Sequence, residues 1–408
     1  MLTIKNVLLP DETRQTITRP YHEDRVIDGS NLLALPGLVD PHVHFRVPGM
    51  EDKEDWLHAS RAALRGGVTT VFDMPNTKPA TTTLERLQNK FAIIDQQLSE
   101  VNLPLRYKLF FGADKNQFHE IAKVKDQIVG IKVFMGASTG DLLMDDESSL
   151  HAIYALAKAH GLLIALHAED ELIIRNNASK YANETDFKYH SIIREPQAAV
   201  KAVELVIKLS EMYKVDSYIL HVSTKAELEL IAAARKQGVQ IFVETCPHYL
   251  FLDETMYPKL QGRGKMNPPL RPPMDQAYLW TALNEGLIDT IGSDHAPHQL
   301  TEKAQPLCKC PSGIPGIETT LPLMLTGWKD GKVSLGKLIE LLHTNPQRIF
   351  KLAANDDLVL VNIHEYRELS DEQFASKCKW SPFSGMKLTG FPQYVYINQR
   401  LFECDKLI

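Results

Sequence analysis

The chain has few cysteines, and their spacing favours neither disulfides nor a thiolate metal site. Its 408 residues include five cysteines, and no two of them are separated by two residues. A disulfide framework or a thiolate zinc site requires more cysteines at closer, regular spacing. Cys308 and Cys310 lie in a polar segment bounded by prolines, and we interpret this pair as incidental to the chemistry.

Long apolar runs and concentrated positive charge are also missing. No run of roughly 18 apolar residues could span a bilayer, and residues 1–7 have the pattern of a β-strand and not of a signal peptide. The formal net charge is −6, and the lysines and arginines are dispersed without runs. We therefore expect a cytoplasmic protein that binds neither membranes nor nucleic acid.

What the chain does contain is a repeated unit of a short apolar run, a polar or glycine-containing loop and a helical segment. Eight such units predict an α/β fold, a parallel (β/α)8 TIM-type barrel whose active site lies at the carboxyl ends of its strands. A doubly wound open sheet is the alternative, but no Gly-x-Gly-x-x-Gly follows the first run. The runs are Leu35–Phe45, Val68–Met74, Tyr107–Phe111, Gly130–Met135, Leu162–His167, Tyr218–His221, Val239–Thr245 and Thr290–Asp294.

The two ends of the chain do not follow this pattern. Residues 1–34 and 356–408 alternate short strand-like runs with turn signals such as Asp28-Gly29-Ser30. Because they flank the barrel in sequence, we predict that they pair into one small composite β-domain. Residues 35–355 would then form the barrel.

His42 and His44 end the first apolar run, and Arg46 follows two residues later. Residues two apart on a strand point to the same face, so both imidazoles can converge on one metal ion. Arg46 offers a permanent cation with two parallel donors, which suits a substrate carboxylate. Two histidines on a half-buried strand could equally be hydrogen-bonded structural residues, so a metal site requires further ligands downstream in the chain.

Polar residues that are costly to bury recur where other apolar runs stop. Four histidines and an aspartate at the ends of four strands are difficult to explain as structural residues. Lys132 lies inside an apolar run; it is either an ion-paired or snorkelling lysine, or a lysine carboxylated by CO₂ that could bridge two metal ions. The residues that end or follow these runs are Asn76, His167, His221, Asp294 and His298.

These motifs together resemble the amidohydrolase superfamily and, within it, the dihydroorotases. The resemblance is carried by His-x-His-Phe-Arg46, Met-Pro-Asn-Thr77, Gly-Ile-Lys132-Val-Phe, the two strand-end histidines and Gly-Ser-Asp-His-Ala-Pro-His298, and it covers essentially the whole chain. It implies interconversion of N-carbamoyl-L-aspartate and dihydroorotate in pyrimidine biosynthesis. It also implies two Zn²⁺ ions, bridged by carboxylated Lys132 and a hydroxide.

The resemblance also assigns roles to single residues. His42 and His44 would bind the more buried zinc, His167 and His221 the more exposed one, and Asp294 would complete the first site and act as general base. Arg46 and Asn76 would hold the substrate carboxylate with help from His298, and Asn267 would contact the pyrimidine ring. A homodimer is expected, and a complex with aspartate transcarbamoylase is possible.

Some bacterial relatives bridge the metals with an aspartate, whereas this chain has Lys132 followed by Gly136-Ala-Ser-Thr-Gly140. This difference favours a carbamate on Lys132 as the bridge between the metals. We interpret Asp141 as a solvated loop residue. We interpret His295 as structural or as supporting the site, and no role is assigned to His248. The segment 300–314 lacks an apolar period, which predicts a mobile lid.

The sequence leaves two alternatives open. One is a dihydropyrimidinase or allantoinase, but their substrates lack the ring carboxylate that Arg46 would bind. The other is a non-catalytic dihydroorotase-like partner of aspartate transcarbamoylase. Such proteins typically lose metal ligands, and none is missing here.

Overall fold

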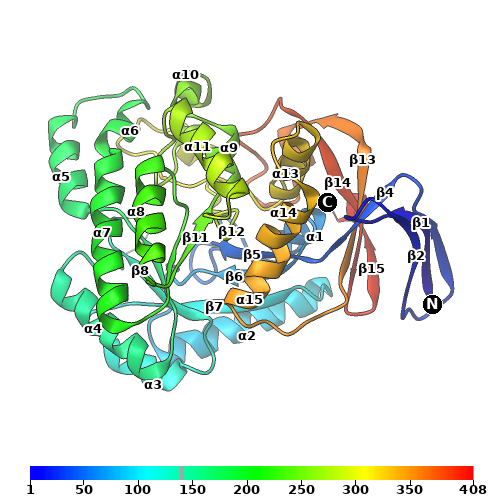
Figure 1. Ribbon diagram of the computed structural model, residues 1–408, viewed down its shortest axis with the longest axis horizontal. Coiled ribbons are helices and arrows are strands. Elements are labelled where there is room, and N and C mark those ends of the chain that lie inside the picture. The colour runs from blue at the N-terminus through cyan, green and yellow to red at the C-terminus, as the bar shows by residue number, and fades with distance from the viewer. Residues whose placement is uncertain (138–141, 408) are drawn as a thin grey trace.

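The computed structural model describes residues 1–137 and 142–407, and a parallel eight-stranded sheet lies at its centre (Figure 1). The strands follow chain order around the sheet. The sheet is nearly closed, because the His44 amide donates to the His295 carbonyl at 2.8 Å and joins the first strand to the segment after the last. The predicted TIM-type barrel is confirmed. Its strands are β5 (Leu38–Val43), β6 (Val68–Asp73), β7 (Arg106–Gly112), β8 (Gly130–Phe134), β9 (Ile164–His167), β10 (Ser217–Ile219), β11 (Ile241–Thr245) and β12 (Thr290–Ile291).

Helices cover the outside of the barrel (Figure 1). Their ends follow local sequence signals: Asp55 and Asp146 cap α1 and α4, Thr224 and Glu227 form a capping box on α8, and left-handed Gly161 ends α4. The helices are α1 (Trp56–Arg65), α2 (Leu84–Val101), α3 (Ile121–Val124), α4 (Glu147–His160), α5 (Glu171–Lys180), α6 (Tyr189–Ile193), α7 (Pro196–Tyr213), α8 (Lys225–Lys236), α9 (Pro247–Phe251), α10 (Tyr257–Leu260), α11 (Pro273–Asn284), α12 (Leu300–Lys303), α13 (Thr320–Lys329), α14 (Leu335–Ile339) and α15 (Asn345–Ile349).

Segments from both ends of the chain form a second, mixed sheet beside the barrel (Figure 1). The join between the two ends is antiparallel pairing of β4 with β13, in which Leu33 faces Val361 and Leu35 faces Val359. The predicted composite sheet is therefore confirmed. Its strands are β1 (Leu2–Leu8), β2 (Arg14–Arg19), β3 (Arg25–Asp28), β4 (Leu32–Pro36), β13 (Leu358–Glu368), β14 (Lys387–Ile397) and β15 (Arg400–Glu403).

The first expected run, Leu35–Phe45, needs a correction because it belongs to two sheets. Leu35 and Pro36 complete β4, and the barrel strand β5 begins at Leu38. Gly37 makes the change of sheet possible, since a side chain there would collide with Thr69 and Asp357. The domain limits proposed at 34/35 and 355/356 stay a prediction.

The interior of the barrel is packed with aromatic side chains. Phe350, which follows α15, lies edge-on to Phe72 and Tyr218, with ring centroids 4.7 Å and 5.1 Å away. Each fully buried aromatic or aliphatic side chain contributes about 1.5–3 kcal/mol relative to exposure. This packing gives the polar residues at the strand ends a rigid base.

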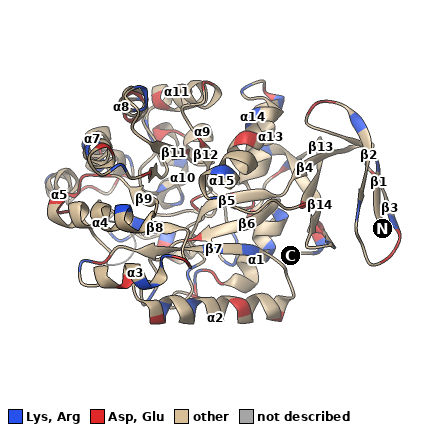
Figure 2. Ribbon diagram, turned by 60° about the horizontal axis from the view of Figure 1, so that its bottom comes forward, with Lys and Arg blue, Asp and Glu red and all other residues tan. Residues whose placement is uncertain are grey.

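The surface shows no segregation of charge between the outer helices. Acidic and basic side chains are interspersed over them (Figure 2). Within the described residues, no helix is long and apolar enough to cross a membrane.

Candidate active site

Three of the predicted metal ligands meet at one point. His42 and His44 lie at the end of β5, and Asp294 lies just beyond β12. The Asp294 Oδ1 atom is 3.2 Å from His42 Nε2 and 3.1 Å from His44 Nε2. All three side chains are buried, so their ligand atoms are held with little freedom to move. The spacing fits a single ion held by two imidazoles and one carboxylate.

A second pair of histidines lies next to this group. His167 ends β9, His221 follows β10, and His167 Nδ1 is 2.9 Å from His221 Nε2. The His221 ring centroid is also 5.4 Å from that of His42. Burial lowers the pKa of both His167 and His221, which leaves the imidazoles neutral and able to bind a metal. These facing nitrogens fit a second ion.

Lys132 lies on β8 and is almost fully buried. Its Nζ atom has no hydrogen-bond partner among the described residues and sits 4.4 Å from the centroid of the Phe134 ring. Burial lowers the pKa of Lys132 to about 7, although Asp294 and Glu244 act in the opposite direction. A neutral amine is the form that reacts with CO₂. A buried, unpartnered amine is costly as a purely structural feature, whereas a carbamate would have metal ions as partners.

Three of the candidate residues have left-handed backbone conformations. The φ angles are 68° at Arg46, 41° at His221 and 44° at Asp294. Residues other than glycine seldom adopt this region, and where they do they concentrate at functional sites. The left-handed conformations of His221 and Asp294 also explain why β10 and β12 are shorter than expected. Each strand ends before the residue whose backbone departs from strand geometry.

Arg46 and His298 lie together beside the histidine cluster. The Arg46 side chain is buried, donates from Nε to the Pro297 carbonyl at 3.2 Å, and has Nη2 3.2 Å from His298 Nε2. Burial lowers the pKa of Arg46 to about 10, so the guanidinium remains charged near neutral pH. A buried cation in this position is suited to binding an anionic group of a substrate.

His298 is neutral in this arrangement. Burial lowers its pKa to about 3, and the neighbouring Arg46 cation acts in the same direction. The Lys53 ammonium lies 3.1 Å from His298 Nδ1, and Nε2 lies 3.1 Å from the Ser312 carbonyl as well as 3.2 Å from Arg46 Nη2. Glu302 accepts from Lys53 at 2.7 Å and thereby fixes the ammonium. Lys53 and Glu302 were not recognised in the sequence as neighbours of the site.

The two asparagines of the predicted substrate site differ in position. Asn76 Oδ1 is 2.8 Å from His44 Nδ1, so this amide orients a predicted metal ligand, and its substrate role stays a prediction. Asn267 is half-buried, and its Oδ1 atom has no hydrogen-bond partner among the described residues. The structure gives no contact that joins Asn267 to the histidine cluster, and its role stays a prediction.

Glu244 is a functional residue that the sequence interpretation missed. Its Oε1 atom accepts from His42 Nδ1 at 2.8 Å, and its Oε2 accepts from the Tyr218 hydroxyl at 2.8 Å. A side chain at Gly292 would overlap the carboxylate, so the glycine leaves room for it. A carboxylate on Nδ1 leaves Nε2 of His42 free as a ligand. The available signal was an acidic residue inside the apolar run of β11, the same anomaly that identified Lys132.

Glu169 has a similar relation to His167. Its Oε2 atom accepts from His167 Nε2 at 2.9 Å and from Arg194 Nη2 at 2.7 Å. Arg194 lies at the end of α6, so the contact is unpredictable from local sequence. Burial raises the pKa of Glu169, but Arg194 and His167 together outweigh it and hold the pKa well below its ordinary value. The carboxylate therefore stays ionised and fixes the ring so that Nδ1 faces His221.

Glu244→Gln should lower metal affinity about 10- to 100-fold, the range typical of residues that orient a metal ligand. The glutamine amide has nearly the shape of the glutamate carboxylate, but it accepts a weaker hydrogen bond from His42 Nδ1. Tyr218→Phe is the matched control, because it leaves the Glu244 Oε1 contact with His42 and removes the hydroxyl contacts with Glu244 Oε2 and Thr290 Oγ1; it should have a smaller effect. Titration with a competing chelator measures both. Equal affinities for wild type and Glu244→Gln would contradict the assigned role.

The predictions for the remaining histidines and for Asp141 have different outcomes. His295 accepts from the Gly316 amide at 3.2 Å and has Nε2 3.3 Å from Glu54, which agrees with a structural or supporting role. His248 lies in α9, where burial lowers its pKa to about 4, and no function is assigned to it. Asp141 lies outside the described residues.

The segment 300–314 is more structured than its sequence indicates. Its first residues form α12, and the buried Lys303 ammonium donates to the carbonyls of Lys265, Pro311 and Gly313 at 2.8–2.9 Å. Cys310 is buried and Cys308 is exposed, and both are free thiols. If segment 300–314 opened as a lid, these hydrogen bonds would have to move with it. The mobility of the segment stays a prediction.

Known proteins are similar to this chain in sequence and in fold. The amidohydrolase family matches residues 33–355. A dihydroorotase from Methanosphaera stadtmanae is 32% identical over 401 residues, covering 95% of this chain and 90% of that protein, and one from Methanosarcina mazei is 34% identical over 92% and 85%. The solved structure of L-hydantoinase (dihydropyrimidinase) from Arthrobacter aurescens superposes with a TM-score of 0.90 at 28% identity, over 98% and 95% of the two chains. The chain therefore belongs to the amidohydrolase family, among the dihydroorotases, and is a hydrolase that acts on cyclic amides.

Proposed function

We propose that the protein interconverts (S)-dihydroorotate and N-carbamoyl-L-aspartate, a reaction of de novo pyrimidine (UMP) biosynthesis. The observation that carries this proposal is the buried Arg46 guanidinium beside the histidine cluster. A cyclic amide with a ring carboxylate would satisfy this cation, whereas a neutral ring would leave it buried without a counter-ion. The dihydroorotase relatives support the same substrate.

We propose two zinc ions as the metal cofactor. His42, His44 and Asp294 would hold one, His167 and His221 the other, and Lys132, carboxylated by CO₂, would bridge them. The facing nitrogens, the converging Asp294 oxygen and the unpartnered Lys132 amine support this arrangement. When bound, the metal pair supplies a water molecule of lowered pKa and polarises the amide carbonyl.

The side chains of the site supply orientation and proton transfer. Burial raises the pKa of Asp294, but contacts with His42 and His44 outweigh it and hold the pKa well below its ordinary value. Asp294 is therefore ionised and can accept the proton of the attacking water, then deliver it to the departing ring nitrogen. Arg46 holds the substrate carboxylate, and neutral His298 lines the same pocket without competing for the anion. Ring closure reverses these steps.

A dihydropyrimidinase or hydantoinase activity is the second candidate, favoured by the likeness to the L-hydantoinase structure. Arg46 argues against it, because those substrates lack the ring carboxylate. A non-catalytic role is not favoured, since the six residues expected to hold metal are all present. We propose in addition a homodimer that can associate with an aspartate transcarbamoylase, which molar mass in solution would test.

The test is metal analysis combined with assays on three substrates. We expect two zinc ions per chain after metal loading, and hydrolysis of dihydroorotate that is lost on chelation and recovered when zinc is restored. Hydrolysis of dihydrouracil and hydantoin should be far slower. One ion per chain would contradict the binuclear site, and preference for either neutral ring would favour the second candidate.

A further inference from the structure

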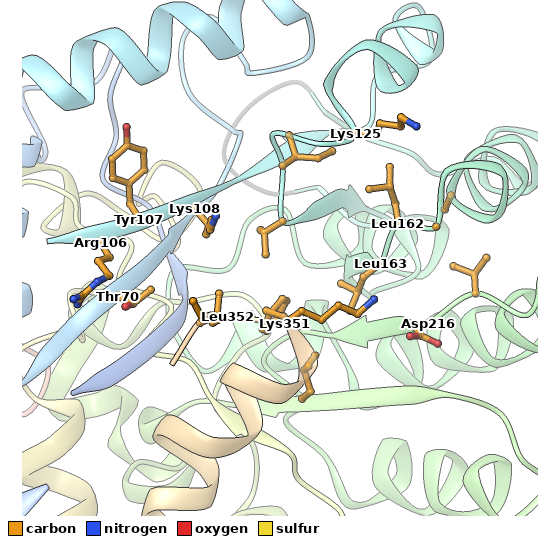
Figure 3. Close-up of a pocket in the computed structure, with 18 of the residues that line it drawn as sticks. Thr70, Arg106, Tyr107, Lys108, Lys125, Leu162, Leu163, Asp216, Lys351 and Leu352 are labelled. Atoms are coloured by element: carbon orange, nitrogen blue, oxygen red, sulfur yellow. The ribbon is translucent and has the colours of Figure 1, made fainter. Parts of the chain in front are cut away.

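A large cavity lies at the end of the barrel opposite to the candidate active site. It has a volume of about 860 Å³ and is lined by residues at the amino ends of β7, β8, β9 and β10 and by the segment after α15 (Figure 3). The active-site residues lie at the carboxyl ends of the strands, so the two sites are separated by the packed barrel interior. A volume in this range suits a drug-sized small molecule.

Basic side chains are concentrated around this cavity although the whole chain has a net charge of −6. Six basic residues line it, against one acidic residue, Asp216. Arg106 is neutralised by a two-pronged contact with Asp357. None of the five lysines forms an ion pair with any other residue that the structure describes. They are Lys108, Lys125, Lys158, Lys214 and Lys351.

Like charges gathered without counter-ions repel one another, so this arrangement weakens the fold unless an anion is present. The five lysines are exposed at the rim, where ammonium groups can reach into the cavity. Lys351 extends toward Leu163, and Lys108 lies on β7 beside Tyr107, on another side of the cavity (Figure 3). Lysine is a common ligand of phosphate because it supplies a compact point charge with three donors.

The floor of the cavity is apolar and already formed. Leu163, Val215, Ile349, Phe350 and Leu352 line it. Phe350 is fixed by its edge-on contacts with Phe72 and Tyr218 inside the barrel. Such a floor offers a surface for a flat ring system, and it does not need to rearrange when one binds.

We propose that this cavity binds a small organic polyanion that carries a ring system, of the nucleoside polyphosphate class. The lysines at the rim bind the phosphates, and the ring lies on the apolar floor. A macromolecular polyanion fits less well, because the basic residues surround one concavity and do not extend as a stripe over the outer helices (Figure 2). The site does not depend on the reaction at the other end of the barrel.

The test is isothermal titration of the full-length, metal-loaded protein with ATP, inorganic tripolyphosphate and adenosine, without added divalent ions. The phosphates of ATP can contact the lysines at the rim while its ring lies on the apolar floor, so ATP should bind at least about ten-fold more tightly than tripolyphosphate or adenosine. Its binding should weaken as ionic strength rises. The double variant Lys108→Glu/Lys351→Glu should bind ATP at least about ten-fold more weakly. Tripolyphosphate binding as tightly as ATP would overturn the role of the floor.

The matched control is Lys5→Glu/Lys387→Glu, which changes the charge by the same amount at exposed lysines of the small sheet. It should change ATP affinity by less than about two-fold, since screening limits distant charges. An equal loss in both double variants would show general electrostatic attraction and overturn the proposal. So would ATP binding that survives Lys108→Glu/Lys351→Glu, because that binding would not depend on the lysines of the cavity. Turnover of dihydroorotate by the Lys108→Glu/Lys351→Glu protein reports that it is folded.

Discussion

Lys132→Ala should lose most of the hydrolase activity and part of its metal. Lys132 lies on β8 within electrostatic reach of Asp294, His167 and His221, and its amine has no hydrogen-bond partner among the described residues. Removal of a bridging ligand should lower kcat/KM by at least about 100-fold, beyond the 10- to 100-fold loss typical when a residue that only orients a ligand is changed. Metal content by mass spectrometry and turnover of dihydroorotate measure the two effects.

Chemical rescue separates a bridging carbamate from a structural lysine. The alanine variant leaves a space where a carbamate would place two oxygens, so acetate or propionate should restore part of the activity and of the bound metal. Propylamine, which resembles the unmodified lysine side chain, is the control and should restore neither. Normal metal content and rate in Lys132→Ala, or rescue by the amine alone, would contradict the proposed carbamate.

The metal-binding cluster could be predicted from sequence because a parallel barrel brings the carboxyl ends of its strands together. Polar residues that interrupt or end apolar runs are therefore neighbours in space even when they are far apart in the chain. His42 and Asp294 are 252 positions apart, yet their side chains are 3.2 Å from each other. The same rule applies to Glu244, because this residue, like Lys132, lies inside an apolar run. The sequence interpretation used that signal for Lys132 and overlooked it for Glu244.

Contacts made by loops and helix ends could not be predicted in this way. Lys53 reaches His298 across 245 positions, and Arg194 reaches Glu169 from the end of α6. Neither contact has a periodic or positional signal, because loop geometry depends on the complete tertiary packing. The buried Lys303 illustrates the same limit: its carbonyl partners are Lys265, which is distant in sequence, and Pro311 and Gly313 of its own segment, and these bonds give structure to a segment whose composition indicates mobility.

Backbone conformation was the other feature hidden from the sequence. Residue type does not predict the positive φ of Arg46, His221 and Asp294, since such conformations are uncommon outside glycine even for histidine and aspartate, in which they are enriched. These three conformations turn the side chains inward just where the strands end. They are maintained by the surrounding packing, which includes the contact of the Phe45 ring with Trp56 at 4.7 Å.

Arg46→Met should lower kcat/KM for dihydroorotate about 30- to 1,000-fold. A charge-assisted contact between guanidinium and carboxylate in a buried pocket is worth about 2–4 kcal/mol when its loss leaves the carboxylate unpaired, and each 1.4 kcal/mol corresponds to about ten-fold in rate. Arg46 is almost fully buried, so water cannot replace the lost donors easily. Methionine keeps much of the length and the apolar stem of the arginine side chain. Metal content should barely change, because Arg46 is not among the proposed metal ligands.

Dihydrouracil supplies the control for Arg46→Met, because it is the same ring without the carboxylate. Its already low rate should change little in the variant, so the ratio of kcat/KM for the two substrates should fall by nearly the whole loss seen with dihydroorotate. Arg46→Lys, which keeps the charge but not the two parallel donors, should lie between wild type and methionine. Equal losses for both substrates would mean that Arg46 serves the reaction centre or the fold. Wild-type preference for dihydrouracil would place the protein among the dihydropyrimidinases in function.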